Sequence, residues 1–160
     1  MSMSEVSMSE QDVLAVESDL LGTLSVPANE TFTFADGLLG FPEAREFVLV
    51  PAEREGFFWL QSLDFGALAF LLVDPFPFVD EFFVDLAESE VGVLEPDDGS
   101  EMAVLAIITL PRQEGDTPTV NLQGPLVFNM KRGLGRQLVL QESRWGVRWS
   151  LSVPDEQPAA

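Results

Sequence analysis

From Thr23 onward the chain consists of short apolar runs that are interrupted every few residues by Gly, Pro, Asn or Asp. Runs of this length are shorter than the helices of a helical domain, and they have the length of β-strands. In residues 31–34, Thr and Phe alternate, so both Phe side chains share one face of a strand. The pattern predicts an all-β domain, either a compact antiparallel β-barrel-like domain or a sandwich, with at most one or two short helices.

The run 102–110 is apolar on both faces, which predicts a central strand that is covered on both sides. Trp59 lies within another predicted strand and is expected in the core. A short helix is predicted over residues 85–94, where early acidic residues suit the helix dipole. Turns are predicted at residues 36–37 and 131–136. The predicted strands are 31–34, 47–50, 57–62, 68–73, 102–110, 126–129, 137–140 and 145–151.

The ends of the chain differ in composition from this β domain. Residues 1–22 contain acidic residues without any Lys or Arg, which is the wrong charge for a secretory signal. We expect a flexible acidic N-terminal extension over 1–22, the β domain over 23–153, and a C-terminal tail over 154–160. An amphipathic helix is the alternative for the extension, because Val13, Val16 and Leu20 recur at helical spacing. The apolar stretch 65–73 is too short to span a membrane, so a cytoplasmic protein is expected.

The chain contains neither Cys nor His. This excludes disulfides, thiolate and imidazole nucleophile systems, and the usual zinc ligand sets. Carboxylate pairs could support glycoside hydrolysis, but with 27 acidic residues such a pair is expected by chance. The acidic residues near Asp97 and Asp98 do not follow the order of a calcium loop, and Asp98-Gly99 fits a turn better. We therefore expect no enzyme, no metal and no cofactor.

The formal net charge is −19 at pH 7. A field of this sign repels phosphate backbones and attracts basic surfaces, so direct nucleic-acid binding is not expected. The acidity is also concentrated, because no basic residue lies between Arg54 and Arg112. The alternative interpretation of the charge is that it only keeps the protein soluble or reflects a salty cytoplasm.

Aromatic residues gather within this acidic interval, in residues 74–83, which two prolines stiffen. Rings surrounded by carboxylates suit the docking of a basic partner, because the rings supply buried area and the charges steer the encounter. In the alternative interpretation the Phe side chains are core and the carboxylates form a solvated rim. We expect at least one ring to remain partly exposed. The candidate partner-binding residues are Asp74, Phe76, Phe78, Asp80, Glu81, Phe82, Phe83, Asp97 and Asp98.

Six motifs, taken in order, resemble the FliW flagellar assembly factor family. Each motif alone is strand and turn chemistry, and the specificity comes from their order along the chain. They span 37–41 (GLLGF), 58–64 (FWLQSLD), 68–75 (LAFLLVDP), 104–111 (VLAIITLP), 120–129 (VNLQGPLVFN) and 135–140 (GRQLVL).

The resemblance implies a small β-barrel-like protein that binds flagellin in the cytoplasm and, when flagellin is scarce, binds CsrA. CsrA is a small dimeric RNA-binding regulator that represses translation of flagellin messages. A protein of this family relieves that repression by protein–protein contact, and a monomer without membrane contact is expected. The alternative function is a generic acidic chaperone or binding module for a basic client. Residues 80–98 resemble the family only in being acidic and helix-prone, so contact residues are not carried over to them.

Overall fold

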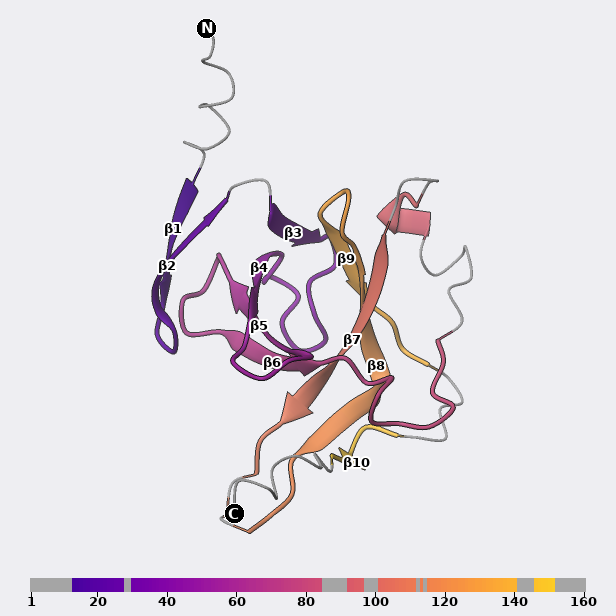
Figure 1. The fold of residues 1–160 in the computed structure, drawn as a ribbon. Coiled ribbons are helices and arrows are strands. Elements are labelled where there is room, and N and C mark those ends of the chain that lie inside the picture. Colours follow the sequence, from indigo (N-terminus) through magenta and orange to yellow (C-terminus); the bar gives the residue numbers. More distant parts are fainter. Residues whose placement is uncertain are drawn as a thin grey trace, which may run out of the picture.

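The computed structural model describes residues 13–27, 30–84, 92–96, 101–111, 113, 115–140 and 146–151 (Figure 1). One 3₁₀ turn, η2 (Gly92–Leu94), is the helical element of these residues, and no helix among them has the length and apolar character needed to cross a bilayer. All other elements are strands. They are β1 (Val13–Ser18), β2 (Gly22–Pro27), β3 (Thr31–Phe34), β4 (Glu46–Pro51), β5 (Phe57–Ser62), β6 (Ala69–Val73), β7 (Met102–Thr109), β8 (Thr119–Asn129), β9 (Leu134–Gln137) and β10 (Trp149–Ser150).

The main sheet closes on itself as a β-barrel. Its strands follow the order β10-β8-β7-β6-β5-β4-β3-β9, and β9 pairs again with β8. All pairs are antiparallel except β3 with β9, which run parallel. Closure removes the open sheet edges that otherwise invite aggregation. The expected all-β, barrel-like domain is therefore confirmed, with one parallel pair in a barrel that was expected to be antiparallel throughout.

Phenylalanine side chains fill the interior of the barrel. Phe32 and Phe34 both point inward from β3, as the alternation predicts, and both are buried. The rings of Phe34 and Phe128 meet edge to face with centroids 5.5 Å apart, and Phe34 and Phe47 do so at 5.4 Å. Gly135 leaves the room for this packing, because a Cβ atom there would lie 2.3 Å from the Phe34 ring.

Strand β7 is central and covered on both sides, as its sequence predicts. It pairs with β6 on one edge and with β8 on the other, with an irregularity between Leu105 and Ile107. Leu105 faces the Phe-rich barrel core, whereas Ala106 and Ile108 pack in a second cluster with Phe57. The barrel therefore has apolar packing outside its wall as well as inside.

The N-terminal segment forms a hairpin instead of a helix. Residues 13–18 pair with residues 22–27 from Val13 to Pro27, so the helical interpretation of this segment is wrong. The boundary predicted between residues 22 and 23 falls inside this hairpin, and residues 1–12 lie outside the described chain. The hairpin lies beside the barrel (Figure 1), and the backbone N–H of Asp19 donates to the Gly66 carbonyl at 3.0 Å.

The hairpin is seated on an outward-facing part of the barrel wall. Val48 and Gln61, which pair across β4 and β5, are almost fully buried although they point away from the barrel core. Trp59 points outward from the same wall and lines a groove beside the hairpin, where it is only half-buried. The expectation that Trp59 is a core residue is therefore wrong.

Other predicted elements differ from the structure mainly at their ends. Strand β8 begins at Thr119, well before the predicted residue 126, and β9 covers 134–137 instead of 137–140. The predicted helix 85–94 lies outside the described residues except for η2. Of the predicted strand 145–151 the structure gives Trp149–Ser150. Val147 is 52% exposed, whereas Leu151 is buried.

Candidate protein-binding surface

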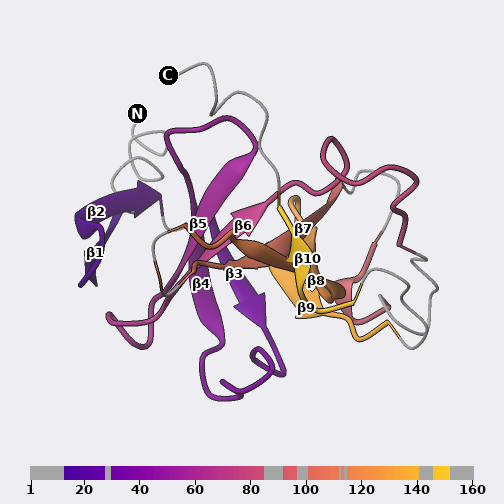
Figure 2. The ribbon, with the colours of Figure 1, turned by 90° about the horizontal axis from the view of Figure 1, so that it is seen from below.

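The predicted partner-binding segment follows β6 and lies at one end of the barrel. Because β3, β4, β5 and β6 alternate in direction, loop 52–56 and the residues after Val73 leave the same end. The backbone N–H of Asp74 donates to the Gly56 carbonyl at 2.9 Å and joins the two segments. The opposite end carries loops 35–45 and 63–68. Figure 2 shows loop 35–45 at the bottom of the view and loop 52–56 at the top.

A compact turn shapes the segment after β6. The Pro75 carbonyl accepts the backbone N–H groups of Phe78 and Val79, both at 3.0 Å. The Asp74 carboxylate accepts the backbone N–H of Phe76 at 3.2 Å. Such a side-chain to backbone bond fixes the start of a turn. Asp74, a predicted contact residue, therefore has a structural role in holding this turn.

The four predicted Phe residues divide into two that pack inward and two that remain exposed. Phe82 is buried, and Phe78 packs with Phe57 at a ring-centroid distance of 6.0 Å. Phe76 is 46% exposed and Phe83 is 66% exposed. Phe76 also contacts Phe82 with centroids 5.4 Å apart, so one exposed ring rests on a buried one. The expectation that at least one ring stays partly exposed is confirmed.

Two carboxylates lie between these exposed rings in the sequence. Asp80 and Glu81 are exposed, and Glu81 has a φ of 63°, a conformation that non-glycine residues seldom adopt. Backbone strain of this kind recurs at binding sites, where the surrounding structure enforces it. We name Phe76, Asp80, Glu81 and Phe83 the acidic-aromatic surface. Asp97 and Asp98 lie outside the described residues.

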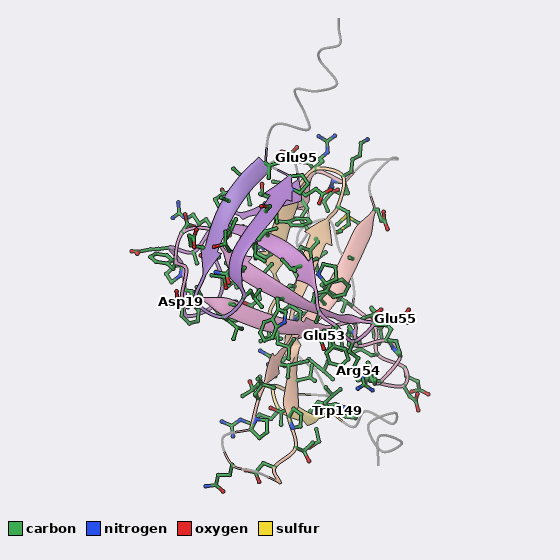
Figure 3. The ribbon with its side chains drawn as sticks, turned by 60° about the vertical axis from the view of Figure 1, so that its left-hand side comes forward. Asp19, Glu53, Arg54, Glu55, Glu95 and Trp149 are labelled. Carbon is green, nitrogen blue, oxygen red and sulfur yellow. The ribbon has the colours of Figure 1, made fainter. Side chains whose placement is uncertain are left out.

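The neighbouring loop adds charge that the sequence analysis did not assign to this surface. Glu53 and Glu55 are exposed in loop 52–56, and the Asp74–Gly56 hydrogen bond brings that loop alongside. The guanidinium carbon of Arg54, between them, lies 5.7 Å from the centroid of the Phe57 ring. Figure 3 shows these three residues grouped at the side of the molecule away from Asp19. No local motif indicates this contribution, because it depends on the pairing of β5 with β6.

The geometry of the acidic-aromatic surface suits binding. Within the described ranges, no three acidic side chains gather closely enough to hold a metal ion. The acidic-aromatic surface combines two exposed rings with exposed carboxylates, a composition that suits a protein-docking patch. The fold defines the class of the protein as a small β-barrel, and this surface is its candidate site for binding another protein.

The comparisons with known proteins identify the family. The family model described as "FliW protein" matches residues 15–151. The flagellar assembly factor FliW of Treponema denticola is 31% identical over 135 residues, which cover 84% of this chain and 91% of that protein. The FliW of Geobacter sulfurreducens is 38% identical over 130 residues, 81% of each chain. This chain belongs to the FliW family, as its six ordered motifs predict.

A solved structure agrees with the assignment. The crystal structure of a flagellar assembly factor FliW superimposes with a TM-score of 0.79 at 28% identity, covering 88% of this chain and 98% of the other. The family consists of assembly factors and not of enzymes, so the expectation of a non-enzymatic protein is confirmed. The family match begins within β1, so it includes most of the N-terminal hairpin.

Proposed function

We propose that this protein binds flagellin and CsrA in the cytoplasm and that its contact with CsrA relieves the repression of flagellin translation. In this account the protein acts as a monomer. Free flagellin occupies it, and when flagellin is exported the protein is released to bind CsrA. The level of flagellin thereby controls the translation of its own message.

The acidic-aromatic surface is the observation that carries the proposal. CsrA binds RNA, so its surface has to include basic residues, and exposed carboxylates at Asp80 and Glu81 would attract them. Phe76 and Phe83 would then supply the apolar contact that holds the complex. The net charge of −19 also disfavours RNA binding by this protein. It therefore favours direct contact with CsrA over competition with CsrA for the RNA.

A titration tests the proposed function. Fluorescently labelled CsrA is mixed with increasing amounts of this protein, and the titration is repeated with flagellin present. We expect a complex with Kd of about 1 μM or tighter, which flagellin weakens. Absence of a complex with either protein at micromolar concentration would contradict the proposal.

An unrelated unfolded protein serves as the control for the alternative function. A generic acidic chaperone holds such a client as readily as flagellin. A specific assembly factor binds flagellin and leaves the unrelated chain free. The control therefore separates the two functions with the same reagents.

A further inference from the structure

A second apolar surface lies at the opposite end of the barrel from the acidic-aromatic surface. Loops 35–45 and 63–68 enclose a groove of about 430 Å³. Phe41 and Phe65 are 42% and 46% exposed, although the chain buries other Phe side chains in its core. The groove is lined by Phe41, Pro42, Ala44, Phe65 and Leu68 and rimmed by Glu43.

The loop that presents Phe41 is held in one conformation. The backbone groups of Leu38 and Phe41 exchange two hydrogen bonds, at 2.7 and 3.2 Å. Gly37 has a φ of 66°, and a Cβ atom there would lie 2.6 Å from the Phe41 and Pro42 carbonyl oxygens. The Phe41 ring packs edge to face on Phe70 at 5.5 Å. A partner would therefore meet a preformed site and lose little entropy in ordering it.

Several backbone donors around the groove are used within its own loops, which limits the form of a partner. The N–H groups of Leu38, Phe41 and Ala44 donate to carbonyls within loop 35–45. The N–H of Phe65 donates to the Ser62 hydroxyl, and that of Leu68 donates to the Phe65 carbonyl. An extended segment binds by pairing its backbone with free groups, whereas a helix satisfies its own. Because these five donors are occupied, the groove suits a helix, which needs no backbone pairing with the loops.

The charge around the groove limits the partner further. Asp36, Glu43 and Asp64 are exposed in the same two loops. Arg45 is the basic residue of these loops, and its Nε donates to the Pro42 carbonyl at 3.3 Å. A second copy of this chain would carry the same net charge of −19, so self-association is opposed by repulsion. A basic partner is attracted instead.

We propose that the Phe41–Phe65 groove is a second docking site, which takes the apolar face of an amphipathic α-helix with basic flanks from a partner protein. Apolar side chains at positions i, i+3 and i+4 of such a helix would contact the two rings, and its Lys or Arg residues would lie near Glu43 and Asp64. The inference rests on no step of the proposed function, because it uses neither the acidic-aromatic surface nor the identity of CsrA.

A designed peptide tests the proposal on the full-length protein. The probe is a labelled Leu/Lys helix of about 18 residues, and the control peptide has the same composition in a scrambled, non-amphipathic order. Fluorescence anisotropy is measured at about 0.15 M salt, which weakens purely electrostatic binding. We expect the amphipathic peptide to bind about tenfold more tightly than the scrambled one. Equal binding of the two peptides would overturn the proposal.

Three matched variants locate the site. Phe41→Ala and Phe65→Ala each remove one exposed ring of the groove, and we expect each to weaken peptide binding about tenfold. Val147→Ala shortens an exposed apolar side chain outside both surfaces and should leave binding unchanged. Thermal melting shows whether each variant is folded. If Phe41→Ala does not fold, Phe65→Ala alone tests the groove. Wild-type affinity in Phe65→Ala, or a wild-type dimer that Phe65→Ala converts to monomer, would overturn the proposal.

Discussion

At the scale of single residues, the same side chain has different roles in different positions of this barrel. Phe34 lies in the interior with rings on two sides, whereas Phe83 extends into solvent from the loop after β6. The sequence predicts the burial of Phe34, because alternation with Thr defines its face. It does not separate Phe76 and Phe83 from Phe78 and Phe82, because that division depends on the distant ring of Phe57.

The Phe→Ala substitution is predicted to cost much stability at Phe34 and almost none at Phe83. Phe34→Ala leaves a cavity in the core and should lower the free energy of unfolding by about 3–5 kcal/mol. Phe83→Ala removes an exposed ring and should change it by less than about 0.5 kcal/mol. Urea denaturation measures both values. A Phe83→Ala variant as unstable as Phe34→Ala would show that this ring is a packing residue and not a contact residue.

Gly135 is predicted to be required because the Phe34 ring lies directly against it. Gly135→Ala places a methyl group against the Phe34 ring and should lower the free energy of unfolding by about 1–3 kcal/mol. Part of this loss should return when Phe34→Leu is added, because the smaller side chain makes room for the methyl group. The four proteins of the double-mutant cycle are compared by urea denaturation. Purely additive losses would contradict the proposed contact.

At the scale of elements, the sequence predicts strands well where period-two alternation or a long apolar run is uninterrupted. The first half of β8 escapes prediction because Gly124 and Pro125 interrupt its pattern. The structure accommodates the interruption locally, since the Asn121 carboxamide accepts the N–H groups of Gln123 and Gly124. The N-terminal hairpin is not predicted for another reason. The spacing of its apolar residues fits a helix as well as a strand, and only its packing against the barrel wall decides between helix and hairpin.

The N-terminal hairpin is predicted to stabilise the barrel without being needed for closure. A chain that begins at Glu30 lacks the hairpin, and the remaining pairs from β3 to β9 are unaffected. Because the buried side chain of Val16 and the Asp19–Gly66 hydrogen bond are lost with the hairpin, we expect a loss of about 1.5–3 kcal/mol in the free energy of unfolding. The measurement is urea denaturation followed by circular dichroism. Loss of the cooperative transition in the shortened chain would mean that the hairpin belongs to the folding core.

At the scale of the whole molecule, the net charge and the barrel act together. The barrel fixes loops at two opposite ends, and each end exposes Phe side chains among carboxylates. The net charge of −19 was evident from composition, but the presence of Glu53 and Glu55 beside the acidic-aromatic surface was not. That placement depends on strand pairing between β4, β5 and β6, which no local pattern in the sequence encodes.

Charge reversal at the acidic-aromatic surface is predicted to slow association with CsrA. Asp80→Lys combined with Glu81→Lys removes the attraction of this surface for a basic partner, so the association rate constant should fall and depend less on salt. The free energy of unfolding should change little, because both residues are exposed. Stopped-flow mixing at several salt concentrations measures the rate. An unchanged salt dependence would place the contact elsewhere.

The central claim is that the exposed rings after β6 contact the partner. Its most direct test is the Kd of labelled CsrA for the Phe76→Ala/Phe83→Ala double variant, compared with wild type and with Phe41→Ala at the opposite end of the barrel. The account predicts that the double variant binds at least about tenfold more weakly while Phe41→Ala binds like wild type. A folded double variant with wild-type affinity for CsrA would contradict it.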